Sequence, residues 1–377
     1  MDVRGGARPR AHPFFGNSLC KGLEQKGETM QTYRLALIGF GNVGQGLASI
    51  LAERGEALAE RFGARFQIVA VSDLLKGSLY DPGGLDAAAL LAAVREHDSL
   101  ESVSAPERGW DALRTIAETE ADAIVEMSYT NLETGEPALS HVRAALQAGR
   151  HVVTTNKGPT ALFFPELLQL AREQGVQIGV EGTVLSGTPA IRMGMEMLAG
   201  AGITKVQGIL NGTTNYILTQ MEAGANYAQA LAEAQEKGYA EADPTGDVEG
   251  HDAAGKVVII ANLLLGLPLT MRDVRHEGIT HLTPQDINAA RDAGERWKLI
   301  GSVERTSTAG FQASVQPVRI SREHPLASIG GATNALTYST DLLGDVTLVG
   351  PGAGRVETGY ALIGDLLAIH RNVKRET

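Results

Sequence analysis

A glycine-rich turn between an expected strand and an expected helix constrains the fold of this chain more than any other feature. Residues 33–38 form a strand-like apolar run and residues 46–51 have a helical pattern. The turn between them consists of Gly39, Phe40, Gly41, Asn42, Val43 and Gly44. In such a unit the glycines permit a tight turn, a close backbone approach to a pyrophosphate and close helix–strand packing. The helix N-terminus then offers N–H groups to phosphate. We predict a dinucleotide-binding unit, and the alternative is a glycine turn in another kind of α/β protein.

Alternating strands and helices follow this turn. Strand-like runs at residues 66–71, 123–127 and 151–153 are interspersed with helical patterns such as residues 137–148. This alternation is typical of a parallel sheet with right-handed crossovers, whose ligands bind beyond the carboxyl ends of the strands. The residues that follow such ends are Gly39, Asp73, Ser128 and Lys157. We therefore predict that these residues meet the cofactor.

Asp73 and Lys76 bear on the choice of dinucleotide. An acidic residue at the end of the second strand accepts hydrogen bonds from the adenosine ribose and favours NAD. A lysine three residues later could instead contact the 2′-phosphate of NADP. The choice stays open, and we expect dual use, with NADP accepted.

An acidic loop in the middle of the chain holds the residues best suited to chemistry. It follows an expected strand at residues 205–210, an expected polar turn at 211–215 and an expected helix at 228–237. Five acids crowd this loop: Glu241, Asp243, Asp247, Glu249 and Asp252. Asp252 and Lys256 are four residues apart at the start of an apolar helix, so they share a face. Such a lysine is either paired structurally or takes part in proton transfer, and the spacing alone does not decide.

The composition excludes several classes of protein. The formal net charge of −11 argues against a nucleic-acid partner. No apolar run reaches the roughly 20 residues that span a membrane. Cys20 is the single cysteine, which excludes internal disulfides and thiol catalysis in the folded part and favours a reducing, cytoplasmic location. Residues 1–30 lack an apolar period, so we expect a disordered tail or a start codon assigned too early, with organelle targeting as the alternative.

Several motifs together resemble the homoserine dehydrogenase family over nearly all of residues 32–370. They are the glycine turn at 39–44, Thr155-Asn156-Lys157, the stretch Gly-Ile-Leu-Asn-Gly-Thr-Thr-Asn-Tyr at 208–216, and the acidic loop. The resemblance implies an α/β fold with a Rossmann dinucleotide-binding domain at 31–158, on which residues 350–377 pack back. It implies an α/β substrate-binding and dimerisation domain at 159–349, with no regulatory domain after it. The implied reaction is the reversible interconversion of L-homoserine and L-aspartate 4-semialdehyde, a small-molecule substrate pair, with NADP or NAD.

The same resemblance assigns roles to individual residues. Lys256 and Lys157 match the active-site lysines, and Asp252 and Glu241 match residues that bind the substrate hydroxyl and amino group. We place Asp247 with the substrate as well, and Gly238 and Gly352 with the cofactor. Residues 181–188 match a monovalent-cation site for Na⁺ or K⁺, with Glu181 and the carbonyls of Val184, Ser186 and Thr188 as its members.

The residues themselves agree with this chemistry. Oxidation of an alcohol needs a base for the hydroxyl proton, and a lysine of pKa roughly 10.4 in water can serve once burial and a second cation lower it. Two other functions stay open, a dehydrogenase for another small hydroxy acid and a catalytically silent dinucleotide-binding sensor. A phosphorylating aldehyde dehydrogenase is excluded because it needs a thiol nucleophile.

The region from about residue 301 to 347 alternates apolar and polar residues. The apolar positions include Phe311, Ala313, Val315, Leu336 and Tyr338. This alternation predicts antiparallel strands with one buried face. The family resemblance implies that these strands pair two subunits, so we predict a homodimer through residues 311–320 or 336–342. The alternative is that they close the substrate domain within one chain.

Overall fold

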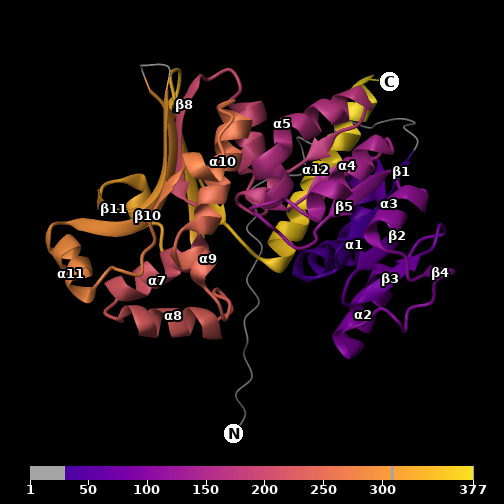
Figure 1. Ribbon diagram of the computed structural model, residues 1–377, viewed down its shortest axis with the longest axis horizontal. Helices are drawn as coiled ribbons and strands as arrows, with labels where there is room; N and C mark the ends of the chain where they lie inside the picture. The colour runs from indigo at the N-terminus through magenta and orange to yellow at the C-terminus, as the bar shows by residue number, and fades with distance from the viewer. Residues whose placement is uncertain (1–29, 307–309, 377) are drawn as a thin grey trace, which may run out of the picture.

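The computed structural model describes residues 30–306 and 310–376, and these form two sheets with their helices (Figure 1). The prediction for the N-terminal tail, with Cys20, lies outside the described residues apart from Met30. Within the described part of the chain, no helix combines the length and the apolar character that a membrane span requires.

The first sheet has seven strands in the order β4-β3-β2-β1-β5-β6-β7. Its parallel strands are β1 (Gln31–Ile38), β2 (Ala64–Asp73), β5 (Ala123–Glu126), β6 (His151–Thr154) and β7 (Ile178–Gly179). The short strands β3 (Gly77–Tyr80) and β4 (Glu107–Arg108) extend one edge in antiparallel fashion. The predicted parallel sheet is confirmed, and the antiparallel edge is an addition to it. The division into domains stays a prediction, and β7 of this sheet falls within residues 159–349.

Helices cover both faces of the first sheet. They are α1 (Asn42–Phe62), α2 (Ala87–His97), α3 (Ala112–Glu118), α4 (Ala138–Gln147), α5 (Lys157–Glu173) and α12 (Arg355–Glu376). The core of one face joins α1, α2 and α12 to Leu35 and Leu37, and the core of the other joins α3, α4 and α5 to Ala36 and Ile38. The two cores follow from the strand period of two, which sends successive side chains to opposite faces.

The last helix returns to the first sheet, where α12 packs against α1 (Figure 1). A Cβ at Gly46 would lie 1.9 Å from the carbonyl oxygen of Arg355, and one at Gly359 would lie 2.6 Å from the amide nitrogen of Leu47. Only glycine at these two positions lets the helices approach so closely. The chain between α1 and α12 therefore leaves the first sheet and comes back to it.

The second sheet has six strands in the order β13-β12-β8-β10-β11-β9. They are β8 (Ile203–Ile209), β9 (Arg275–His276), β10 (Glu295–Arg305), β11 (Phe311–Ser321), β12 (Thr333–Thr340) and β13 (Gly344–Pro351). All neighbours pair antiparallel except β9 with β11. The antiparallel strands predicted between residues 301 and 347 are confirmed.

Helices of the second half lie between and beside these strands. They are α6 (Ala190–Arg192), a π-helix (Met193–Met197), α7 (Gly212–Glu222), α8 (Tyr227–Glu236), α9 (Thr245–Val248), α10 (His251–Leu264) and α11 (Pro284–Asp292). Single 3₁₀ turns occur at η1 (Glu181–Thr183), η3 (Met271–Asp273) and η4 (Pro325–Ser328). The segment from Ala190 to Met197 is a single α turn followed by the π-helix. The polar turn predicted at 211–215 is wrong, because α7 begins at Gly212 and Asn211 is its N-cap.

The two faces of the second sheet differ. Val315, Leu336 and Tyr338 belong to the core that this sheet shares with α7 and α10. Phe311, predicted on the same buried face, is instead 40% exposed. The opposite face is hollowed between β8, β10 and β11 and is lined largely by polar side chains: Lys205, Gln207, Ser302, Glu304, Gln312, Ser314 and Gln316. Leu336 and Tyr338 are therefore covered by their own chain, whereas part of β11 is not.

Candidate active site

Asp252 is held between two lysines from different parts of the chain. Its carboxylate lies 2.8 Å from Nζ of Lys256, one turn later in α10, and 3.3 Å from Nζ of Lys157, the first residue of α5. Burial by itself would raise the pKa of Asp252, but the two ammonium groups outweigh it and hold the pKa well below its usual range. The structure thus brings together the three residues that we predicted to be catalytic.

Lys256 enters the site from the buried side of α10. Its side chain is only 7% exposed, and Nζ donates a hydrogen bond of 2.7 Å to the carbonyl oxygen of Leu210 at the end of β8. Within the described residues these contacts to Leu210 and Asp252 occupy two of its three N–H groups. The third remains to reach a bound molecule.

Asn211 and Thr213 join the site from the first turn of α7, which sequence reasoning did not foresee. Asn211 donates to Asp247 at 2.7 Å and to Asp252 at 3.1 Å. The single hydroxyl hydrogen of Thr213 is shared between Asp247 at 3.0 Å and the carbonyl oxygen of Tyr239. Burial and the charge of Asp252 raise the pKa of Asp247, against the opposing effect of the two hydrogen bonds. The available signal was an asparagine before Gly-Thr-Thr, which is a favoured start for a helix.

Glu241 and Gly238 lie in the segment between α8 and α9. Glu241 is exposed, and within the described residues no hydrogen bond or ion pair engages its carboxylate. Gly238 has φ +73° and precedes Tyr239, whose carbonyl accepts a hydrogen bond from Thr213. The structure thus brings Asp247, but not the Glu241 carboxylate, into contact with the hydrogen-bonded group around Asp252.

The glycine turn fits a dinucleotide phosphate. Gly39 has φ +95°, and a Cβ there would lie 2.6 Å from the carbonyl oxygen of Met127. Gly41 faces open space, since a Cβ there would meet nothing within 4 Å. The N-terminus of α1 has no side-chain cap and no acidic residue in its first turn. Its N–H groups therefore suit an anion.

Asp73 ties the glycine turn to the β2–β3 turn. Its carboxylate accepts hydrogen bonds from the backbone N–H of Phe40 at 2.6 Å, Leu75 at 3.0 Å and Lys76 at 2.9 Å. The ammonium of Lys76 lies 2.7 Å from Asp98. Asp98 thus competes with a 2′-phosphate for Lys76.

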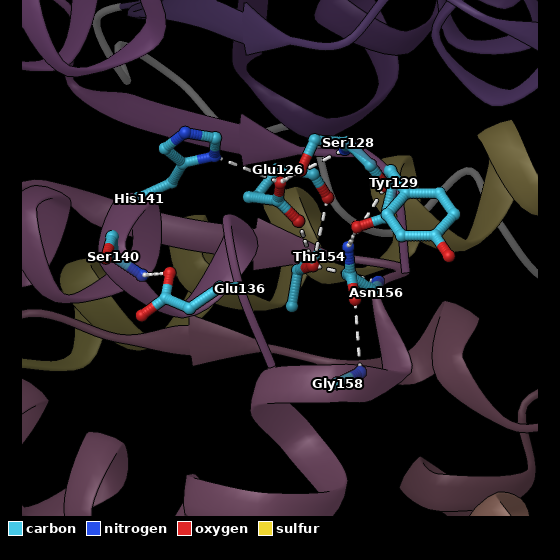
Figure 2. Close-up of polar contacts among 9 residues, drawn as sticks. All are labelled: Glu126, Ser128, Tyr129, Glu136, Ser140, His141, Thr154, Asn156 and Gly158. Atoms are coloured by element: carbon cyan, nitrogen blue, oxygen red, sulfur yellow. Dashed lines mark hydrogen bonds and ion pairs between the residues drawn. The ribbon is translucent and has the colours of Figure 1, made fainter. Parts of the chain in front are cut away.

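A fully buried glutamate lies at the end of β5, next to Ser128 (Figure 2). Glu126 accepts hydrogen bonds from the N–H and the hydroxyl of Ser128 and from the hydroxyl of Thr154 at 3.3 Å, and it lies 3.5 Å from Nδ1 of His141. The sequence placed Glu126 inside an apolar strand, and its charge there was the signal of a buried polar group.

Asn156 connects this network to Gly158 in the first turn of α5 (Figure 2). Its side chain donates to the carbonyl oxygens of Ser128 and Tyr129, both at 3.0 Å, and caps α5 by accepting from the N–H of Gly158. Its own N–H donates to Thr154. The ends of β5 and β6 are therefore fixed to the first turn of α5, which carries Lys157.

The residues of the cation-site prediction have other partners. Both carboxylate oxygens of Glu181 accept backbone N–H groups, from Ile191 and Arg192, and burial raises the pKa of this carboxyl. The carbonyl of Thr188 accepts from Ala190. Among the described residues no cluster of three or more His, Cys, Asp or Glu side chains could hold a metal. The monovalent-cation site stays a prediction, because a carbonyl or carboxylate oxygen that accepts one N–H group keeps a lone pair for a cation.

Gly352 lies against a buried amide. A Cβ there would lie 2.1 Å from the side chain of Asn334, whose polar atoms have no hydrogen-bond partner among residues 30–306 and 310–376. The contact requires glycine at this position. Its role with the cofactor stays a prediction.

Comparison with known proteins finds one family throughout. The homoserine dehydrogenase model matches residues 189–367, and the model of the homoserine dehydrogenase NAD-binding domain matches residues 39–181. The NAD(+)-dependent homoserine dehydrogenase of Pseudomonas canavaninivorans is 48% identical, over 92% of this chain and 99% of its own.

Solved structures agree. The homoserine dehydrogenase of Thiobacillus denitrificans superposes with a TM-score of 0.79 at 32% identity, over 92% of this chain and 75% of its own. A hyperthermophilic archaeal homoserine dehydrogenase mutant in complex with NADPH gives a TM-score of 0.78 at 27% identity, over 91% of this chain and 98% of its own.

Proposed function

The chain belongs to the homoserine dehydrogenase family of NAD(P)-dependent oxidoreductases, and we propose that Lys256, Asp252 and Lys157 form its reacting centre. The observation that carries this proposal is the placement of one carboxylate between two ammonium groups, 2.8 and 3.3 Å away. The reaction interconverts L-homoserine and L-aspartate 4-semialdehyde. A proton must leave or reach the substrate oxygen in it, and Lys256 has an N–H group left for that exchange.

Lys256 moves the proton in this scheme. In the reductive direction its ammonium donates a proton to the aldehyde oxygen and becomes the neutral amine, and in the oxidative direction the neutral amine takes the hydroxyl proton of homoserine and becomes the ammonium. Asp252 fixes both lysines by its ion pairs, and Lys157 supplies positive charge beside the oxygen on which negative charge develops. The bound dinucleotide supplies the hydride acceptor or donor.

Carboxylates beside this centre suit the substrate ammonium. Asp247 lies in the hydrogen-bonded group with Asp252, and we assign it to the amino group. Glu241, in the exposed segment between α8 and α9, is assigned to the same amino group as a second carboxylate. Two carboxylates favour a zwitterionic amino acid over a simple hydroxy acid, whose carboxylate they would repel.

The glycine turn and Asp73 are the groups that would hold the dinucleotide. The α1 N-terminus meets the pyrophosphate, and the Asp73 carboxylate accepts the ribose hydroxyls. We propose that the enzyme uses both NAD and NADP. The contact of Lys76 with Asp98 favours NAD, because it engages the cation that a 2′-phosphate would need.

We also propose a homodimer in the cytoplasm. The open, polar face of β8, β10 and β11 is the surface offered to a second copy, since its other face is filled by the core. A two-fold dimer is the commonest closed assembly. The cytoplasmic location rests on the absence of cysteine from residues 30–377 of the sequence.

An activity assay tests the function. NADH and NADPH formation are followed with L-homoserine, and their oxidation with aspartate semialdehyde, each dinucleotide being used separately. Other small hydroxy acids serve as competing substrates. We expect the highest kcat/KM with homoserine, and a higher value with another hydroxy acid would contradict the proposal.

A further inference from the structure

The side-chain amide of Asn211 has one orientation that satisfies all its neighbours. Its Oδ1 accepts hydrogen bonds from the N–H of Thr214 at 2.9 Å and the hydroxyl of Thr214 at 3.0 Å. Because this end must be the acceptor, Nδ2 faces the other way. There it donates to Asp247 at 2.7 Å and to Asp252 at 3.1 Å. The residue is buried, so both amide protons are committed to carboxylates.

The two carboxylates need such a neutral bridge. Asp247 comes from α9 and Asp252 from α10, and like charges from separate segments repel each other. The charged and polar groups facing this pair are Lys256 of α10, Lys157 of α5 and Thr213 of α7. Both lysines contact Asp252, whereas Asp247 is held only by Asn211 and Thr213 among the described side chains. Its position therefore depends on neutral donors.

We propose that Asn211 is a positioning residue that sets the separation of Asp247 and Asp252, so that the pair matches the ammonium and hydroxyl ends of the substrate. This inference rests on the proposed function of the two carboxylates. The amide is itself oriented by the start of α7, so the helix N-terminus and the substrate site share one side chain. Asn211 acts through the aspartates and takes no part in proton transfer.

The substitution Asn211→Ser separates this role from helix capping. Serine caps a helix about as well as asparagine, but its short side chain cannot reach both carboxylates. Asn226→Ser is the matched control, because Asn226 caps α8 with a similar bond of 2.9 Å to the N–H of Gln229 and is exposed. Both substitutions exchange an asparagine N-cap for a serine N-cap. Only Asn211→Ser also removes the hydrogen bonds to Asp247 and Asp252.

The two variants differ in steady-state kinetics. We expect Asn211→Ser to raise KM for homoserine and lower kcat/KM about ten- to hundredfold, the effect of losing hydrogen bonds to a charged group. KM for NAD⁺ should equal that of Asn226→Ser, whereas the melting temperature of Asn211→Ser should be lower, because two buried carboxylates lose a hydrogen-bond donor. The acid limb of kcat/KM should move to higher pH, since the lost hydrogen bond was one of the two that lower the pKa of Asp247.

A double-mutant cycle with Asp247→Asn completes the test. If Asn211 acts through Asp247, adding Asn211→Ser to Asp247→Asn costs much less than it does in the wild type. Kinetics and a pH profile of Asn211→Ser equal to those of Asn226→Ser would overturn the inference.

Two controls keep the result decisive. If Asn211→Ser fails to bind NAD⁺, Asn211→Asp replaces it, because aspartate keeps the shape and the cap acceptor but has no donor. Wild-type kcat/KM in that variant would overturn the inference equally. The activity of the wild-type enzyme with homoserine is measured in the same experiment. If the proposed function is wrong, the wild type itself is inactive with homoserine. If only the inference is wrong, the wild type is active and the Asn211 variants behave like the control.

Discussion

Replacing Lys256 by methionine removes the ammonium and keeps an unbranched side chain in the core. The structure shows which contacts of the site this variant keeps. Asp252 keeps Lys157 at 3.3 Å and Asn211 at 3.1 Å, so its charge is not left unpaired. The carbonyl of Leu210 loses its hydrogen bond to Nζ. Neither change touches the glycine turn.

The expected magnitudes follow from these contacts. A carbonyl left without its partner costs about 1–3 kcal/mol of stability, which a domain stable by about 5–15 kcal/mol survives. Loss of proton transfer lowers kcat by about 10²–10⁴-fold. Affinity for NAD⁺ should stay within a factor of about two, because Lys256 contacts none of the predicted cofactor-binding residues.

Lys298→Met is the matched control for this experiment. Lys298 is also a buried lysine, and Nζ donates to the carbonyl of Ile329 at 2.7 Å and to Asn215 at 3.0 Å. Burial lowers its pKa to about 8, and it lies outside the hydrogen-bonded group around Asp252. NADH formation with homoserine, NAD⁺ titration and thermal melting are compared for both variants. An equal fall of kcat in the two would refute a chemical role for Lys256, and so would wild-type kcat in Lys256→Met.

Three further predictions follow from the same contacts. Asp73→Ser should shift the ratio of kcat/KM towards NADP, and Asp98→Asn should do so as well by releasing Lys76; unchanged ratios would show that these residues do not face the ribose. Glu126→Gln should raise KM for the dinucleotide more than KM for homoserine, because the network holds the Ser128 loop; equal effects would assign the glutamate to stability alone. Light scattering should give twice the chain mass of 39.8 kDa at micromolar concentration, and a monomer mass would exclude the proposed dimer.

The local parts of this fold could be read from the sequence. The strands β1, β2, β5 and β6 and the glycine turn were predicted because each is specified by neighbours in the chain. Asp252 and Lys256 were paired for the same reason, since four residues in a helix place two side chains on one face. α5 was missed, because Gly158 and Pro159 follow its first residue and Pro165 lies inside it. Such residues favour turns, yet a proline in the first turn of a helix loses no hydrogen bond.

The site depended on contacts that the sequence does not show. The polar run at 211–215 is as typical of a turn as of a helix start. The role of Asn211 depends on the positions of Asp247 and Asp252, which come from other elements. Glu126 is similar, because its partners His141 and Thr154 come from other elements. The family resemblance placed Lys157 and Asp252 in one active site, but their ion pair was not predicted. The distance between Lys157 and Asp252 along the sequence does not indicate the ion pair, because the two residues lie on different helices.

α12 is fixed to the segment that leads from the first sheet to the second. The ion pair between Lys157 and Asp252 links α5 to α10, but its groups are a quarter and a fifth exposed, and such pairs contribute little by themselves. A buried link lies elsewhere: Asp365 of α12 accepts from the N–H of Glu181 at 2.9 Å and from Arg192 at 2.6 Å. Glu181 in turn accepts two N–H groups at the start of α6. Burial makes these groups costly to separate, so Asp365 fixes the returning helix to residues 181–192. Lys157 reaches Asp252 because α5 packs directly against α10.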